Sequence, residues 1–194
     1  ILGDYEVRSV PFIIAEDVYV KTMKLAFQFV QNQRCGTTVP GFHGPCHLDD
    51  ARLRGDGDHV DVTGGWHDAG DLRKWMSTTP PVVMGLVDAQ EQLDPDWRNA
   101  GCEWPALLQE ARWENDYYLK MQDPETGLVW HDTGGGVAGD NTDNHWTDNE
   151  PGTEDDRFIN QRFVPFVQWD WIACQAHVAR AFAGRDAEYS GRCR

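Results

Sequence analysis

The chain has 194 residues, with 17 Lys and Arg against 32 Asp and Glu, which gives a formal net charge of −15. A charge of this sign repels a phosphate backbone, so the composition argues against a protein that binds DNA or RNA. The longest apolar stretches, around residues 25–30 and 82–87, are far shorter than the roughly 20 residues of a membrane-spanning helix. We therefore expect neither a nucleic-acid partner nor a membrane partner.

Apolar residues recur at helical spacing in four segments, and Pro or Gly marks most of their ends. We expect helices over residues 16–34, from Pro80 to the residue before Pro95, from Pro105 to the turn at Asp123, and from Pro165 to Gly184. We also expect another helix to begin after Asp186. The regions 35–78 and 123–163 are long, irregular and rich in Gly, Asp, His and Trp. Because long loops in a compact domain are commonly functional, we expect an all-α fold whose chemistry lies in these two regions.

The aromatic and sulfur-containing residues allow more than one interpretation. Each of the nine Trp residues is either a core residue or a flat platform for a sugar ring. The five Cys residues are an odd number, so at least one of them is a free thiol or a metal ligand. We expect Cys102, Cys174 and Cys193 to be buried free thiols.

Two other patterns give little support for a ligand site. The three glycines 134–136 lack the Lys and the Ser or Thr of a phosphate-binding loop. The acidic stretch from Asp140 to Asp156 does not fit the twelve-residue calcium loop, because His145 stands where that loop requires Gly. We expect a solvated acidic loop there.

The run from Asp61 to Asp71 places Asp68 and Asp71 three residues apart, among glycines that permit tight turns. Two such carboxylates can contact a single water, one accepting its proton while the other orients it. The alternative is a pair of Asp residues that only stabilise a turn.

A second group of residues consists of Cys35, Cys46, His47 and His67. Two thiolates and two imidazoles are the ligand set of a closed tetrahedral zinc site. The alternative is a disulfide between Cys35 and Cys46, with both His residues making ordinary hydrogen bonds.

The octapeptide Gly-Gly-Trp-His-Asp-Ala-Gly-Asp at 64–71 resembles the signature of glycoside hydrolase family 9, the inverting cellulases. Residues 8–12 and 16–19 are similar to the entry to the catalytic domain in family members that carry an N-terminal immunoglobulin-like module, and residues 33–36 and 46–50 to the segment that follows. Residues 120–124 and 126–129 are similar to the stretch of the family after the next barrel helices. The resemblance implies that the chain is the N-terminal portion of an (α/α)6 barrel with long functional loops.

The resemblance also implies roles for single residues. Asp71 corresponds to the general base that deprotonates the attacking water, and Asp68 to the residue that helps to hold this water. His145, Trp146 and His131 correspond to residues that bind the substrate. The general acid of the family, a Glu, has no counterpart in this chain.

Family members with the immunoglobulin-like module carry a zinc site made of a Cys, a Cys-His pair and the His before the catalytic Asp. All four positions match here, at Cys35, Cys46, His47 and His67. The resemblance therefore implies a structural zinc that supports the loop of Asp68, and it allows calcium in the complete domain.

The chain begins with Ile1 and ends as a helix begins, so we expect a processed or excised piece of a longer protein. Residues 1–12 are expected to be the end of a linker or of a preceding module, and 13–194 the N-terminal part of the glycosidase catalytic domain. The expected partners are a β-glucan or oligosaccharide and the C-terminal remainder of that domain.

The function expected from the resemblance is inverting hydrolysis of β-1,4-glucosidic bonds in cellulose or related glucans, outside the cell or in the periplasm. One alternative is an exo-acting glucosidase or glucosaminidase of the same fold. Another is a non-catalytic, zinc-stabilised carbohydrate-binding fragment. A zinc hydrolase is disfavoured, because a catalytic zinc keeps a position open for water.

Overall fold

The computed structural model describes residues 10–15, 18–54, 57–99, 105–135 and 146–194, and the structural statements below concern these residues. Within them the chain forms α1 (Val18–Asn32), β1 (Lys74–Trp75), α2 (Pro80–Asn99), α3 (Pro105–Lys120), β2 (Asp132–Gly135), β3 (Phe158–Asn160), α4 (Pro165–Phe182) and α5 (Ala187–Arg192). The proposed boundary at residue 13 remains a prediction, since residues 1–9 lie outside the described ranges.

Helices α1, α3 and α4 lie within the ranges that their apolar periodicity predicts, and α5 begins directly after Asp186. The prediction for α2 is wrong at its end, because the helix continues through Pro95 to Asn99. A proline inside a helix removes one backbone hydrogen bond, but residues on both sides keep theirs, so the helix can continue through it.

The all-α prediction is incomplete, since the two regions expected to be irregular form an antiparallel sheet of order β1-β2-β3. Lys74 pairs with Thr133, and Thr133 pairs with Ile159. These strands are two to four residues long, too short for a period-two pattern to stand out in the sequence. The sheet joins the chain after α1 to the chain before α4.

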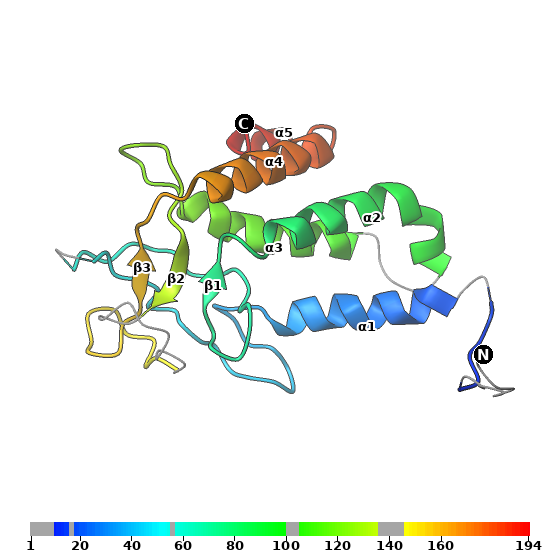
Figure 1. The fold of residues 1–194 in the computed structure, drawn as a ribbon, viewed down its shortest axis with the longest axis horizontal. Helices are drawn as coiled ribbons and strands as arrows, with labels where there is room; N and C mark the ends of the chain where they lie inside the picture. Colours follow the sequence, from blue (N-terminus) through cyan, green and yellow to red (C-terminus); the bar gives the residue numbers. More distant parts are fainter. Residues whose placement is uncertain (1–9, 16–17, 55–56, 100–104, 136–145) are drawn as a thin grey trace, which may run out of the picture.

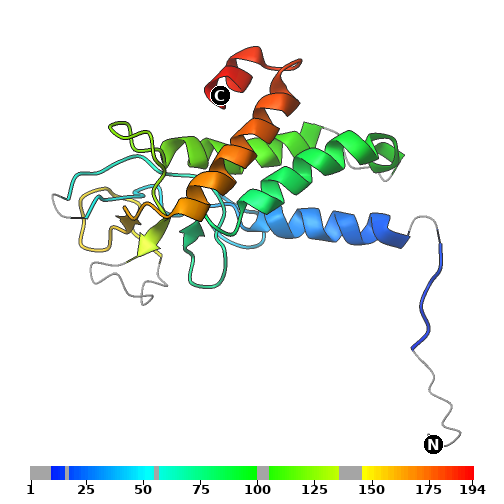
Figure 2. The same cartoon turned by 45° about the horizontal axis from the view of Figure 1, so that its top comes forward.

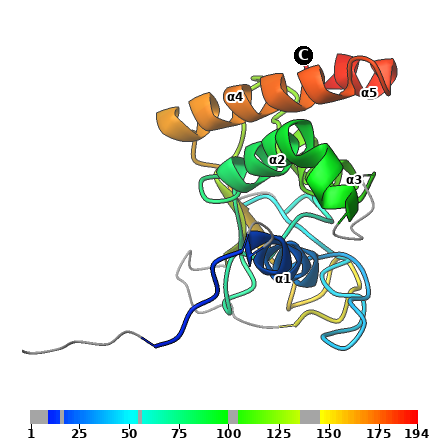
Figure 3. The ribbon, with the colours of Figure 1, turned by 90° about the vertical axis from the view of Figure 1, so that its right-hand side faces the viewer.

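The helices form layers at one side of this sheet. Figures 1 and 3 show α1 on one side of the α2 and α3 pair, and α4 with α5 on the other. The buried core contains Val83 and Val87 of α2, Leu108 of α3 and Val178 of α4. None of the described helices is both long and apolar enough to cross a membrane.

Apolar side chains remain uncovered on the outer helices. Leu25 and Phe29 of α1 are 68% and 63% exposed, and α4 exposes Phe166, Trp169 and Ile172. Residues 10–15 extend away from the helices, as Figure 2 shows. These faces lie outside the packed core, so the described residues do not enclose a complete helical barrel.

Some of the described tryptophan residues are buried and others are exposed. Trp66 and Trp130 are buried in the core, whereas Trp146 and Trp169 are largely exposed. Cys174 and Cys193 are buried free thiols, as expected. Cys102, for which the same was expected, lies outside the described residues.

Candidate active site and metal centre

The loop 64–73 lies against the backbone of the residues that come directly after α1. The His67 amide donates to the carbonyl of Gln33 over 2.8 Å, and the Cys35 amide donates to the carbonyl of Gly65 over 2.8 Å. Two backbone bonds therefore fix the middle of the loop against the end of the first helix.

Helix α3 supports the same loop from the other side. Gly65 has φ +76°, and a Cβ atom there would lie 2.8 Å from the ring of Tyr117. Trp113 donates its indole N–H to the carbonyl of Gly65 over 3.0 Å, while Trp66 donates to Glu110 over 2.8 Å. Only a glycine provides both the left-handed backbone and the close approach to the helix.

The two carboxylates of the signature lie on a tight turn at the end of this loop. The Asp68 amide donates to the carbonyl of Arg73 over 2.8 Å, and Oδ1 of Asp71 accepts from the Arg73 amide over 3.3 Å. Asp68 is exposed and Asp71 is half-buried. The bond to Asp71 agrees with the turn-stabilising alternative, and it also holds that carboxylate in one place.

A buried ion pair connects this turn to the sheet. The guanidinium of Arg73 pairs with the carboxylate of Asp132, which also accepts from Asn160 over 2.8 Å. His131 Nδ1 lies 2.7 Å from the second oxygen of Asp132, and its ring meets that of Trp75 edge-on with centroids 5.3 Å apart. His131, expected at the substrate, is thus linked to the 64–73 loop through Asp132 and Arg73, two residues that the sequence analysis missed.

A second buried group of charged side chains contacts the 64–73 loop. Asp50 accepts from Arg157 over 2.6 and 2.8 Å and from Lys74 over 2.7 Å. Burial alone would raise the pKa of Asp50, but the charges of Arg157 and Lys74 hold it well below its usual range. Lys74 also donates to the carbonyl of Gly64, and Arg157 to that of Leu72, so both cations hold the loop backbone.

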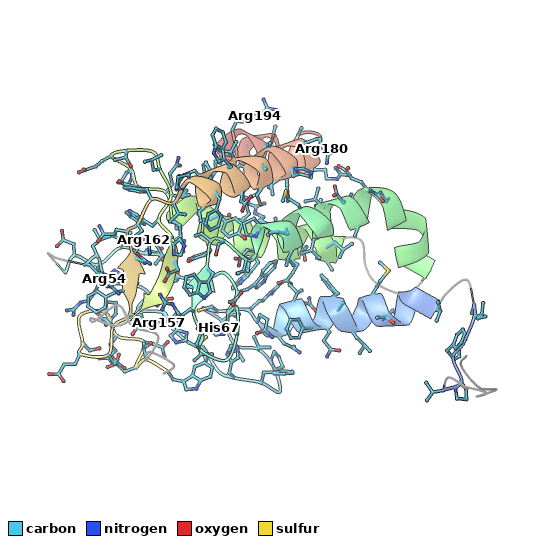
Figure 4. The ribbon with its side chains drawn as sticks, in the orientation of Figure 1. Arg54, His67, Arg157, Arg162, Arg180 and Arg194 are labelled. Atoms are coloured by element: carbon cyan, nitrogen blue, oxygen red, sulfur yellow. The ribbon has the colours of Figure 1, made fainter. Side chains whose placement is uncertain are left out.

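The four residues expected to bind zinc lie together and are buried. One ligand atom from each of Cys35, Cys46, His47 and His67 lies within 4.8 Å of the others. Cys35 Sγ is 3.5 Å from His47 Nδ1, His67 Nε2 is 3.3 Å from His47 Nδ1, and Cys46 Sγ is 4.0 Å from His67 Nε2. Both thiols are free, so the disulfide alternative is wrong. Figure 4 shows His67 at the sheet end of the molecule, near Arg157.

These distances and protonation tendencies fit a zinc ion. Zinc bonds of about 2.0 Å to nitrogen and 2.3 Å to sulfur give tetrahedral edges of roughly 3.3–3.8 Å, close to the separations of the donor atoms. A hydrogen bond with Cys35 lowers the pKa of Cys46 to about 7. Burial lowers the pKa of His67. Both shifts favour the thiolate and the neutral imidazole, the forms that bind the metal.

The family model for glycosyl hydrolase family 9 matches residues 19–194. The chain belongs to this family. Endoglucanase D of Acetivibrio thermocellus is 33% identical over 212 residues, which cover 96% of this chain and 32% of that protein. A cellodextrinase of Butyrivibrio fibrisolvens is 35% identical over 141 residues, which cover 64% of this chain and 25% of the relative. The chain thus spans about a third or less of the length of these family 9 relatives.

Solved structures of family 9 proteins have the same fold over this length. A mutant endoglucanase from Alicyclobacillus acidocaldarius matches with a TM-score of 0.73 and 25% identity, over 93% of this chain and 36% of its own. A Zn-binding triple mutant of another family 9 endoglucanase matches with a TM-score of 0.74 and 28% identity, over 95% and 37%. The helix-rich fold with few strands is therefore that of family 9.

Trp146, another expected substrate residue of this family 9 chain, lies next to the Cys/His group. The ring of Trp146 is 55% exposed and stacks on His47, with centroids 5.7 Å apart and an interplanar angle of 16°. Trp146 therefore covers the group of four ligands on its solvent side. His145 lies outside the described residues.

The acidic segment after Trp146 is not simply a solvated loop. Asp156 is 4% exposed, and its Oδ2 lies 3.0 Å from Nε of Arg52. The expectation of a solvated loop is therefore wrong for Asp156, because an arginine from the 35–78 region compensates its charge.

Proposed function

We propose that this chain is part of the catalytic domain of an inverting β-1,4-glucan hydrolase in which Asp71 is the general base and Asp68 holds the attacking water. The observation that supports this most directly is the turn at 68–73, which immobilises Asp71 through the Arg73 amide and leaves Asp68 exposed. The relatives named endoglucanase and cellodextrinase support the substrate class.

In the proposed reaction, Asp71 accepts a proton from a water on the face of the sugar opposite the leaving oxygen. The water oxygen bonds to the anomeric carbon as the glycosidic bond breaks. The leaving oxygen takes a proton from a carboxylic acid supplied by a Glu outside this chain. Arg73, held by Asp132, keeps the backbone of the turn in place, so the base is oriented before the substrate binds.

We also propose that Cys35, Cys46, His47 and His67 hold a structural zinc. When bound, this ion acts as a closed cross-link and supplies no open position for water. His67 precedes Asp68 directly, so fixing its imidazole also fixes the backbone of the water-holding residue. The solvent side of this site, with Trp146, is proposed to contact the glucan, together with His131 and His145.

The rest of the catalytic domain is the proposed partner of the exposed apolar faces on α1 and α4. Those faces, which include Phe29 and Trp169, are suited to packing against further helices of a barrel. We further propose secretion, with residues 1–12 as a linker or the end of a preceding module.

The stereochemistry of the first product tests the reaction. In the complete protein acting on a cellooligosaccharide, proton NMR is expected to detect the α-anomer first, because the water attacks opposite the leaving group. Early formation of the β-anomer would mean a covalent route with retention, and the role given to Asp71 would be wrong. Asp71→Asn is expected to lower kcat by about 10²–10⁴ and leave substrate binding nearly unchanged.

Metal analysis tests the zinc site. One zinc per chain is expected in purified protein, and Cys46→Ser is expected to remove it. Cys174→Ser is the matched control, since it replaces another buried free thiol outside the group of four. Protein without zinc, or equal zinc in both variants, would contradict the proposal.

A further inference from the structure

A second group of side chains that could bind a metal consists of Asp49, Asp155 and Asp156, none of which belongs to the proposed zinc site. Asp49 follows His47 by two positions, and one oxygen each of Asp49, Asp155 and Asp156 lies within 4.8 Å of the others. Asp49 is 0% exposed and Asp156 is 4% exposed. Three carboxylates from two loops far apart in the sequence therefore meet in a largely buried place.

One oxygen of the most buried carboxylate lacks a partner. Asp49 Oδ1 accepts a hydrogen bond from Thr147 over 2.6 Å, whereas Oδ2 is buried and has no hydrogen-bond partner. Buried carboxylate oxygens are almost always hydrogen-bonded, paired with a cation or bound to a metal, because removal from water is otherwise unfavourable. Asp49 Oδ2 is therefore an acceptor that a cation could bind.

The neighbouring carboxylate already has its own partners. Asp156 Oδ2 lies 3.0 Å from the guanidinium of Arg52 and also accepts from the Gly152 amide over 2.8 Å. Thr153 donates to Asp155 over 2.6 Å. The Asp148 amide donates to the other oxygen of Asp155 over 2.8 Å. None of these bonds reaches Asp49 Oδ2, and the guanidinium of Arg52 compensates only part of the negative charge of three carboxylates that repel one another at this distance.

We propose that Asp49, Asp155 and Asp156 bind a calcium ion. The donors are all carboxylate oxygens, which hard divalent cations prefer, whereas zinc prefers sulfur and nitrogen. Calcium takes six to eight oxygen ligands in flexible geometry, while magnesium keeps several of its waters. A largely buried group of carboxylates favours the ion that gives up its water more readily.

The ion ties the loop of the proposed zinc ligands to the loop of Trp146. Thr147, next to Trp146, bonds to Asp49, and the Leu48 amide donates to Oδ1 of Asn149 over 3.0 Å. Calcium bound to Asp49 therefore adds a further link between these two loops. This site is independent of the proposed hydrolytic reaction.

Calcium binding by the zinc-loaded full chain tests the site. Calorimetric titration with CaCl2 is expected to show a site that Asp155→Asn weakens by about tenfold or more, because calcium affinity depends on ligand charge. Glu154→Gln is the matched control, since it removes one charge from an exposed neighbour in the same loop. Equal calcium affinity in Asp155→Asn, Glu154→Gln and the unaltered chain would overturn the proposal, as would the absence of binding.

Thermal unfolding of Asp49→Asn gives a second readout. Without calcium this variant is expected to melt above the unaltered chain, because it removes a buried charge that lacks a partner. With calcium the unaltered chain gains in Tm and the variant does not. A calcium-dependent rise in Tm that is equal in both proteins would reject Asp49 as a ligand, and the Asp155→Asn titration remains decisive if Asp49→Asn does not fold.

Discussion

At the scale of single residues, Gly65 combines a left-handed backbone with close contact to the Tyr117 ring. Gly65→Ala is expected to lower the free energy of unfolding by about 1–3 kcal/mol or more, because it strains the backbone and displaces the ring. Gly85→Ala in α2 is the control, since it has open space and a helical setting, and a gain of about 0.5–1 kcal/mol is expected. Urea denaturation measures both, and equal effects would contradict this account of Gly65.

The two kinds of ion pair near the 64–73 loop differ in burial. Asp132→Asn is expected to cost about 3–5 kcal/mol of stability, because it leaves the buried Arg73 guanidinium without this carboxylate. Asp61→Asn removes the exposed pair with Lys120 and is expected to cost about 0–1 kcal/mol. Chemical denaturation of the two variants checks the difference. A loss at Asp132 as small as that at Asp61 would show that the pair with Arg73 does not hold the turn.

At the scale of elements, α3 carries a buried acid that makes stability depend on pH. Burial raises the pKa of Glu114 from 4.5 to about 8, although Thr79 donates to its Oε1 over 2.8 Å and Lys74 lies near enough to lower it. The folded chain keeps this proton up to about pH 8, whereas the unfolded chain releases it near pH 4.5. Glu114 therefore stabilises the fold fully below about pH 4.5, and this contribution is lost as the pH rises to about 8.

The expected loss from this one group is on the order of 4 kcal/mol between about pH 5 and pH 8. Glu114→Gln keeps the shape and removes the proton equilibrium, so its free energy of unfolding is expected to change less over this range. Denaturant titrations at several pH values compare the two proteins. The same loss in both would mean that another group carries the pH dependence.

The helices could be predicted from the sequence because each repeats its apolar spacing over several turns. The strands could not, since β1 has two residues and β3 three. Cys35, Cys46, His47 and His67 were found because these residue types are rare and chemically specific. The ion pairs that fix the loop were missed because their partners lie far apart in sequence, 59 residues for Arg73 and Asp132 and 107 for Asp50 and Arg157. From the sequence alone, a charged residue in a loop is expected to be exposed to solvent, because its ion-pair partner is known only from the folded structure.

At the scale of the whole molecule, α4 presents an apolar face that no other described element covers. The 194-residue chain alone is expected to self-associate and to bind a hydrophobic dye, because Trp169 is 70% exposed beside Phe166 and Ile172. Trp169→Gln is expected to reduce both effects, while Phe42→Ser, at an exposed loop residue, serves as the control. Light scattering and dye fluorescence measure them. A chain that stays monomeric and binds no dye would contradict the proposal that the apolar face of α4 packs against further helices.

The separation of Asp50 from Arg157 also sets an order of events during synthesis. At about 5–20 residues per second, the ribosome needs roughly 5–20 s to add the 107 residues between them. Until Arg157 has been made, Asp50 lacks this guanidinium, and the 64–73 loop lacks the hydrogen bond from Arg157 to the carbonyl of Leu72. We therefore expect the 64–73 loop to reach its final conformation only after most of the chain has been synthesised, although its own residues are among the first to be made.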